Sequence, residues 1–311
     1  MARLAGKLLG ANYLEFDGTQ PYTKWAALKG SWPRRRGKHK ALVIAAQPGD
    51  LNRLSERLGW LRGYEFSVGW VIDSFWEDRI PRVAKGHFDQ LFITDGDLTD
   101  SWEKRTGTST AWLPWGAEAL RQPELAQERP VDLQRLGRQP GAWDDDDRAT
   151  AAAVKQGMTY RGRPPYSDSL EEGQRMLRAT LVQAKYVLAF SNRVGNADYT
   201  HKRHEYVTGR WTQALAAGAC VAGLSPRCRA TRELLWPEGL LELSGIDLES
   251  GIAEVAAAAQ TWTPEVAVQN RQKALERLDW RHRFAELASA LEWSAPRLQA
   301  ELDEIRELLA P

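Results

Sequence analysis

The strongest constraint on the fold is a pair of consecutive series of short strand-like segments, continuously apolar in the first series, that alternate with helical stretches. The first series has segments at 41–46, 64–72, 90–94 and 110–113, and the second has segments at 131–136, 159–161, 186–190, 219–224 and 240–243. Continuous apolar runs, unlike alternating ones, are typical of parallel strands that are buried on both faces. We therefore expect an α/β chain with two doubly wound layers, each built on a parallel sheet.

A polar segment divides the two series and predicts a linker. Residues 117–130 are polar and end in Arg129-Pro130, and 311 residues are enough for two domains of ordinary size. We expect an N-terminal domain at 1–120, a second domain at 131–290 and a C-terminal helix at 291–311. In the first domain we expect a helix near 51–61. In the second half we expect helices near 147–156, 170–183, 206–217 and 228–235, followed by helices that start at Asp247, Thr263-Pro264, Asp279 and Ser294-Pro296.

Composition argues against several classes of protein. The 42 basic and 41 acidic residues give a net charge of +1, unlike a protein that binds nucleic acid by neutralising phosphates. The dense basic run 34–40 is either a solvated approach to a strand or a contact for an anionic acceptor.

The two cysteines, Cys220 and Cys228, indicate neither a disulfide framework nor a zinc site. With no spanning apolar run and no secretory signal, we expect a soluble cytoplasmic chain without a transmembrane segment.

The most informative segment runs from Ser191 to Gly218. An apolar strand leads into a polar loop, and a helix is expected from near Tyr206 to the Ala-Ala-Gly sequence that ends at Gly218. The loop carries His201, Lys202 and Arg203, and the residues expected to share one helix face are Tyr206, Arg210 and Gln213. Cations around a helix N-terminus suit a diphosphate. The alternative interpretation is a solvated loop followed by an ordinary surface helix.

The stretch from Arg210 to Val221, Arg-Trp-Thr-Gln-Ala-Leu-Ala-Ala-Gly-Ala-Cys-Val, resembles the donor-site helix and following strand of GT-B glycosyltransferases. This group includes the family-four and spore-maturation-type enzymes, whose pattern places one Glu in the loop and a second Glu eight residues later. Glu205 stands at the first position, whereas Gln213 replaces the second. Two further segments support the resemblance, Leu136-Gly137-Arg138 and the stretch 279–284. The resemblance covers 131–290 well, and it covers 41–116 only as a fold pattern.

The resemblance implies two Rossmann-like domains facing a cleft, with a C-terminal helix that crosses back to the N-terminal domain. It implies transfer of a sugar from a nucleotide-sugar donor to a hydroxyl of a glycan, lipid-linked or small-molecule acceptor, with no cofactor and no divalent metal. The donor-binding residues that it implies are Arg138, Lys202, Arg203, Tyr206, Arg210 and Gln213. His201 and Glu205 would face the sugar, and Gln213 the ribose. If the anomeric centre inverts, Asp73 is the first choice for the base and Asp95 the second.

Three other functions stay open. Asp95-Gly96-Asp97 has the form by which a metal-dependent transferase holds Mn²⁺, although turn chemistry produces the same spacing at strand ends. The acidic run 144–147 needs no metal to explain it, because it precedes a helix, where the helix dipole favours negative charge.

The remaining two alternative functions are a sugar-nucleotide epimerase and a non-catalytic nucleotide-sugar-binding protein. The replacement at Gln213 points toward the last of these.

Overall fold

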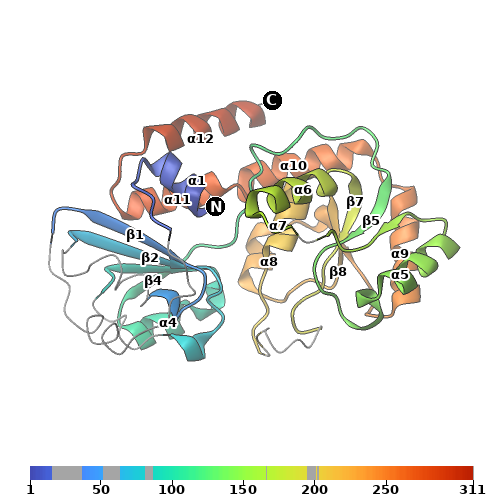
Figure 1. Ribbon diagram of the computed structural model, residues 1–311, viewed down its shortest axis with the longest axis horizontal. Coiled ribbons are helices and arrows are strands. Elements are labelled where there is room, and N and C mark those ends of the chain that lie inside the picture. Colours follow the sequence, from blue (N-terminus) through green and yellow to red (C-terminus); the bar gives the residue numbers. More distant parts are fainter. Residues whose placement is uncertain are drawn as a thin grey trace. The chain divides into compact units, whose positions relative to one another are not determined.

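The computed structural model describes residues 1–15, 37–51, 64–80, 87–165, 167–194, 201 and 203–310 of the chain (Figure 1). The chain divides into two compact units. Unit 1 comprises Met1–Pro114 and Arg281–Glu304, and unit 2 comprises Trp115–Trp280 and Ile305–Pro311. Each unit is an α/β layer on its own parallel sheet, which confirms the expected fold class. None of the described helices is both long and apolar enough to cross a membrane.

Unit 1 is built on four parallel strands in sequential order. They are β1 (Lys40–Ala45), β2 (Phe66–Val71), β3 (Gln90–Ile93) and β4 (Ser109–Trp112). Its short helices are α1 (Ala2–Leu9), the 3-10 helices η2 (Glu77–Arg79) and η4 (Gly96–Leu98), and α4 (Thr99–Thr106). All four strands lie at the apolar segments that predicted them. The helix expected at 51–61 lies outside the described residues apart from Leu51.

Three tryptophans of unit 1 donate their indole N–H groups to backbone carbonyls near the carboxyl ends of the strands. Trp70 bonds Leu113 O at 3.1 Å, Trp102 bonds Ser74 O at 3.1 Å, and Trp112 bonds Thr94 O at 3.0 Å. Trp70 and Trp102 are fully buried. A buried indole stabilises a fold through its large apolar area only if its N–H finds an acceptor. These tryptophans therefore hold the ends of the sheet together.

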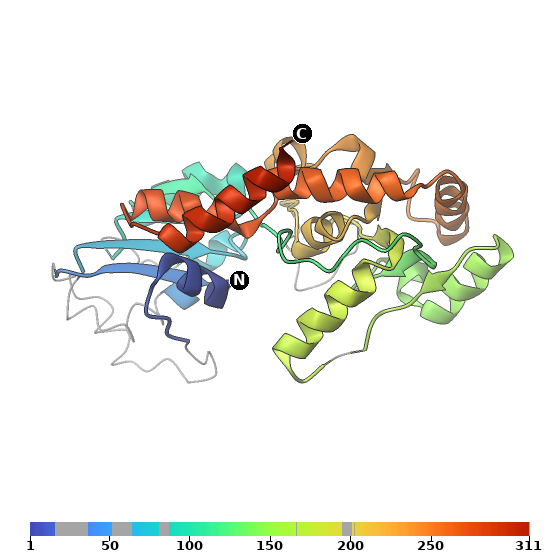
Figure 2. The same cartoon turned by 90° about the horizontal axis from the view of Figure 1, so that it is seen from above.

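Most of two helices late in the chain, the segment Arg281–Glu304, belongs to unit 1. Helices α11 (Trp280–Ala290) and α12 (Pro296–Leu309) lie side by side (Figure 2). The buried Arg281 near the start of α11 donates to Glu301 in α12 at 2.6 Å, which is the pairing of an antiparallel hairpin. Lys40 at the start of β1 donates to Leu291 O at 2.6 Å between the two helices. The segment after unit 2 thus returns to the first unit, as the resemblance implied.

Unit 2 is built on five parallel strands in the order β6-β5-β7-β8-β9. They are β5 (Val131–Arg135), β6 (Tyr160–Arg161), β7 (Ala184–Leu188), β8 (Cys220–Gly223) and β9 (Leu240–Glu242). From β5 the chain proceeds to β6 on one side, and from β7 it proceeds to β8 on the other side. The order of the strands therefore reverses between β5 and β7, which makes this pair the topological switch point of the sheet.

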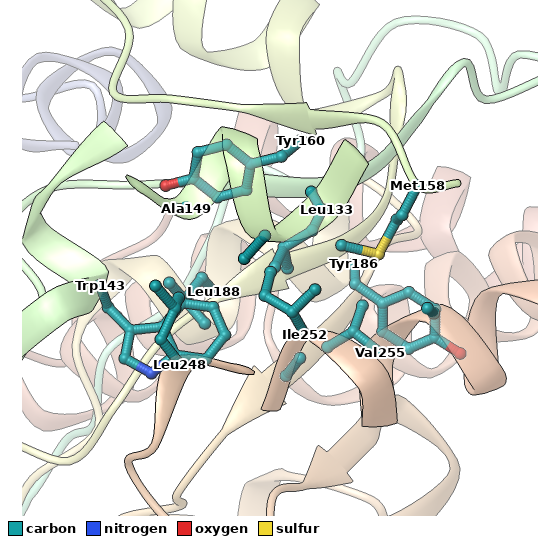
Figure 3. Close-up of a cluster of buried hydrophobic side chains, with 14 of the residues drawn as sticks. Leu133, Trp143, Ala149, Met158, Tyr160, Tyr186, Leu188, Leu248, Ile252 and Val255 are labelled. Atoms are coloured by element: carbon teal, nitrogen blue, oxygen red, sulfur yellow. The ribbon is translucent and has the colours of Figure 1, made fainter. Parts of the chain in front are cut away.

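Helices cover both faces of this sheet. On one face α5 (Asp146–Lys155) packs against α9 (Leu248–Gln260), and α9 contacts β5 and β7 (Figure 1). On the other face lie α6 (Leu170–Leu181), α7 (Gly209–Ala216) and α10 (Pro264–Arg277), with α7 in contact with both other helices. The short helices η5 (Gly141–Asp144), α8 (Arg229–Leu234) and η6 (Pro237–Gly239) complete the unit. Figure 3 shows the core under α5 and α9, where Trp143, Leu133 and Ile252 are fully buried.

A buried guanidinium joins the C-terminal ends of α6 and α7 to the start of β7 in unit 2. Arg129 donates to Ala184 O at 2.6 Å, to Ala217 O at 2.7 Å and to Leu181 O at 3.4 Å. Burial, helped by the nearby charge of Arg271, lowers the pKa of Arg129 to about 10. The carbonyls at the C-termini of α6 and α7 carry partial negative charge that stabilises this cation. Arg129 therefore fixes the side of the sheet opposite the strand ends that bind ligands in such folds.

We predict that Gly218→Ala destabilises the protein by about 2–4 kcal/mol, because two separate costs add. Gly218 has φ +82°, and a Cβ there would lie 2.7 Å from Arg129 Nη2 and 2.8 Å from Ala267 O. The control is Gly245→Ala, where a Cβ meets nothing within 4 Å and we expect a change within about 0.5 kcal/mol. Urea unfolding measures both variants. Equal stabilities would contradict the packing described at Gly218.

Candidate functional site

The candidate site lies at the carboxyl ends of β5 and β7. In open α/β sheets, ligands bind in the crevice that opens where two neighbouring strands send their chains in opposite directions. The loop after β5 spans 136–145, and the loop after β7 spans 189–208 and leads into α7. All the donor-binding residues that the sequence predicts, except Lys202, which lies outside the described residues, lie on these two loops or on α7.

Arg135, the last residue of β5, holds the first loop in place through bonds to its backbone and side chains. Its buried guanidinium donates to Gly137 O at 3.0 Å and to Asp144 O at 2.9 Å, and it pairs with the carboxylates of Asp144 and Asp146. Burial alone would raise the pKa of Asp146, but the Arg163 N–H and the Arg135 guanidinium outweigh it and lower that pKa. Gly137 has φ +65°, a left-handed conformation that favours glycine. The turn that carries the next residue, Arg138, is therefore fixed.

The acidic run 144–147 has two roles. Asp145 is the N-cap of α5 and accepts the Arg148 N–H at 3.1 Å, as expected for acidic residues before a helix. Asp144 and Asp146 bind Arg135 instead, so they support the loop after β5.

Gln139 joins the two strands of the switch point. Its buried side chain donates from Nε2 to Leu136 O at 2.7 Å, just after β5, and to Leu188 O at 3.1 Å, at the end of β7. The two strand ends are thus held together by one amide. Gln139 was not among the residues predicted from the sequence, although its position directly after Gly137-Arg138 was an available signal.

Helix α7 begins at Gly209, three residues later than expected. The expectation that Tyr206 shares a helix face with Arg210 and Gln213 is therefore wrong, and Arg210 lies in the first turn of α7 instead of the second. The physical reason is that the backbone of 201–206 bonds a side chain of the preceding loop, which keeps it out of the helix. Thr208 is the N-cap but makes no capping bond with its side chain.

The structure brings Arg210 and Arg138 together across 72 positions of sequence. Arg210 Nη1 donates to Arg138 O at 3.1 Å, and a Cβ on Gly137 would lie 3.8 Å from Arg210 Cδ. Gln213 lies alongside the first turn of the same helix, with Oε1 3.7 Å from where a Cβ on Gly209 would be. The Arg210 guanidinium, in the first turn of α7, therefore lies against the backbone of the loop at Arg138, and Gln213 lies near Gly209 at the start of the same helix. Positive charge at a helix N-terminus favours binding of an anion.

Glu205 is held in place by the residues that follow β7. Ser191 Oγ donates to Glu205 Oε1 at 2.6 Å, and Arg193 Nη1 lies 3.9 Å from Oε2. The Glu205 side chain is 12% exposed. A carboxylate with one oxygen bonded to a hydroxyl keeps lone pairs for further donors. Sequence reasoning named Glu205 but missed Ser191, whose signal was a polar residue directly at a strand end.

His201 shapes the loop through its ring. Its Nδ1 accepts the backbone N–H of Arg203 at 3.2 Å and that of His204 at 3.0 Å, so in this arrangement Nδ1 carries no proton. The His201 and His204 rings lie 4.7 Å apart between centroids. The side chain of Arg203 is exposed. Lys202 lies outside the described residues.

The predicted acidic residues of unit 1 follow strands β2 and β3. Asp73 follows β2, is partly buried, and burial raises the pKa of its carboxyl group. Asp95 Oδ1 accepts the Asp97 N–H at 3.1 Å, and the Asp95 N–H donates to Ser74 Oγ at 3.0 Å. Asp95 thus caps the short helix η4. Within the described ranges, no three His, Cys, Asp or Glu side chains gather as a metal ion would require.

Comparison with solved structures identifies the architecture. A Staphylococcus aureus TarM variant with fondaparinux, α-GlcNAc-glycerol and UDP matches with TM-score 0.52 and 7% identity over 80% of this chain and 55% of its own. A glycosyltransferase from Rickettsia africae matches with TM-score 0.52 and 6% identity over 91% and 84% of the two chains. Anabaena HepE in complex with UDP matches with TM-score 0.50 and 10% identity over 86% and 81%.

The chain has a GT-B fold. The fold class expected from the sequence is therefore confirmed, and so is the resemblance to GT-B glycosyltransferases at the level of the fold. This chain spans about half the length of the TarM chain and more than four fifths of the other two. No protein-family model and no curated protein matches the sequence. Of the predicted site residues, Arg138, Arg203 and Arg210 belong to unit 2, and Asp73 belongs to unit 1.

We predict that Asp73→Asn stabilises the protein at pH 7. The raised pKa means that the folded state binds the proton more tightly than the unfolded state, so the ionised carboxylate of the wild type costs stability at neutral pH. The gain shrinks as the pH falls through the raised pKa and vanishes below about pH 4, where the group is protonated in both states. Urea unfolding between pH 3 and pH 8 measures it.

The matched control is Asp168→Asn, at an exposed loop position before α6, for which we expect a change within about 0.5 kcal/mol at every pH. A loss of stability in Asp73→Asn at pH 7 would contradict the prediction, because it would show that the ionised carboxylate stabilises the folded state through a structural partner.

Proposed function

We propose that this chain is a glycosyltransferase that binds a nucleoside-diphosphate sugar at the switch point of unit 2 and transfers the sugar to an acceptor hydroxyl without a divalent metal. The observation that supports this most is the contact of the Arg210 guanidinium, in the first turn of α7, with the backbone carbonyl of Arg138 in the loop after β5, on a GT-B fold. Backbone carbonyls or carboxylates in place of these cations would favour a cationic ligand and not a diphosphate.

The first chemical requirement is a stable leaving group. When the bond between the anomeric carbon and the phosphate oxygen breaks, negative charge develops on the diphosphate, and prearranged positive groups lower the barrier. Arg210 in the first turn of α7 and Arg138 on its fixed turn supply this charge, and the helix dipole adds to it. Lys202 and Arg203 are the further candidates in the same loop. With these cations, the proposed mechanism needs no metal.

The second requirement is an oriented donor. Hydroxyl groups of the sugar and the ribose need fixed hydrogen-bond partners, because correct orientation supplies much of the rate enhancement. We assign Glu205 and His201 to the sugar, Gln213 to the ribose, and Tyr206 to the edge of the donor site. Gln213 is neutral, so it bonds a ribose hydroxyl less strongly than a carboxylate does.

The third requirement is a nucleophile, the acceptor hydroxyl. We assign acceptor binding to unit 1. If the reaction inverts the anomeric centre, a base must take the proton of the acceptor hydroxyl, and Asp73 is the proposed base. Its pKa is raised by burial, which makes the carboxylate a better proton acceptor near neutral pH. The acceptor class, a glycan, a lipid-linked sugar or a small molecule, follows from the resemblance alone.

The test begins with UDP, because UDP is bound in two of the structures that share this fold. We predict that UDP raises the melting temperature of the wild type, since a ligand at one hundred times its dissociation constant stabilises the folded state by about 2.7 kcal/mol. In Arg210→Ala we expect the affinity to fall at least about tenfold, because a charge-assisted hydrogen bond contributes about 1.5–3 kcal/mol. Thermal shifts with UDP, GDP, ADP, CMP and dTDP measure this and identify the base.

The matched control is Arg175→Ala on α6, whose guanidinium is 73% exposed and pairs with Glu172 of the same helix. It should bind UDP like the wild type. No shift with any nucleotide would contradict the proposal, and a shift abolished by EDTA would move the assignment to Asp95 and Asp97. Turnover of a sugar nucleotide without an acceptor would indicate an epimerase, and binding without any transfer would indicate a non-catalytic protein.

A further inference from the structure

Asn192 occupies a special place in the loop after β7. It follows the strand by four residues, lies next to Ser191 at the carboxyl edge of the switch point, and is 9% exposed. A buried side-chain amide costs free energy unless its donors and acceptor find partners. Its partners therefore show what holds it in place.

Every polar atom of this amide is bonded to the backbone of the loop before α7. Asn192 Nδ2 donates to His201 O at 2.9 Å and to His204 O at 2.8 Å, and Oδ1 accepts the Tyr206 N–H at 3.3 Å. Among side chains of this length, only an amide offers two donors and an acceptor at once. An aspartate would place an oxygen against two carbonyl oxygens. The loop thus needs Asn at this position.

These bonds bracket Glu205. The backbone is fixed at 204 and 206, on either side, while Ser191 Oγ holds the carboxylate itself at 2.6 Å. Two neighbouring residues therefore set both the backbone and the side chain of Glu205. His201 Nδ1 closes the same loop by accepting two of its N–H groups.

We propose that Asn192 is the positioning residue for recognition of the donor sugar. It holds Glu205 where the carboxylate accepts hydrogen bonds from hydroxyls of the sugar of a nucleoside-diphosphate sugar. A carboxylate repels a diphosphate, which has no hydrogens to donate at neutral pH, so this device acts on the sugar and not on the diphosphate. The inference rests on the proposed function and adds to it a residue that determines specificity for the sugar.

The experiment compares two ligands on the same variants by calorimetry. The probes are the tightest binder among UDP-glucose, UDP-galactose, UDP-GlcNAc and GDP-mannose, and its parent nucleoside diphosphate. In Asn192→Asp we expect the sugar nucleotide to bind about tenfold more weakly, the effect of one lost hydrogen bond, and the parent diphosphate to bind within about twofold of wild type. Glu205→Gln should give the same pattern.

A double-mutant cycle separates positioning from a general loss of structure. If Asn192 acts through Glu205, the double variant binds the sugar nucleotide about as weakly as either single variant, so the effects do not multiply. Asn192→Ala, which removes the bonds without adding charge, should match Asn192→Asp and keeps the test valid if that variant fails to fold. Asn12→Asp, at an exposed position of unit 1, controls for the added charge.

Three outcomes would overturn the inference. Equal weakening of both ligands, or multiplying effects in the double variant, would show that Asn192 has only a structural role or acts apart from Glu205. Unchanged binding in both Asn192 variants would show that the loop does not need the amide. If the wild type binds none of the probes, it is the proposed function that fails, and the inference fails with it.

Discussion

The site depends on one constraint of parallel sheets, that two neighbouring strands whose chains depart in opposite directions leave a crevice at their carboxyl ends. In unit 2 these strands are β5 and β7. Their pairing brings the loop at 136–145 beside the loop at 189–208, although more than forty residues separate the two loops in sequence. The contact between Arg138 and Arg210 follows from this pairing. Without the reversal of strand order, the same side chains would lie on a continuous, filled sheet edge.

Buried polar side chains fix the loops, and the cationic side chains proposed to bind the ligand are more exposed. Arg135, Gln139 and Asn192 are all buried, and each bonds backbone groups of the loops at the switch point. The side chain of Arg138 is exposed and that of Arg210 is half-buried. Such a division suits catalysis, because a group that is already oriented pays no reorganisation cost when charge develops. It also explains why several residues that matter to the site touch no ligand in the proposed mechanism.

Most of the described strands were predictable because they are largely apolar runs, and burial on both faces leaves that pattern in the sequence. In contrast, β5 contains Asp132, Gln134 and Arg135, and β6 has only two residues, so these two were predicted from the alternation of strands with helices. The start of α7 was not predictable from local signals, since the bonds from Asn192 to residues 9 to 14 positions away override the helical tendency of the loop. Asp279 shows the same limit. The sequence marks it as the start of a helix, which α11 confirms, but its carboxylate also accepts the N–H groups of Ala119 and Leu120, both at 2.9 Å. That contact depends on tertiary structure that no local motif encodes.

The central claim is that a nucleotide binds at the carboxyl ends of β5 and β7. Amide hydrogen exchange followed by mass spectrometry, with and without UDP or the nucleotide that gives the largest thermal shift, tests it most directly. The account predicts slower exchange in three segments of unit 2, at 137–139, 191–194 and 203–211, because a bound diphosphate orders these loops and the first turn of α7. Protection confined to the amino ends of the strands around Arg129 and Gly218, or no protection anywhere, would contradict it.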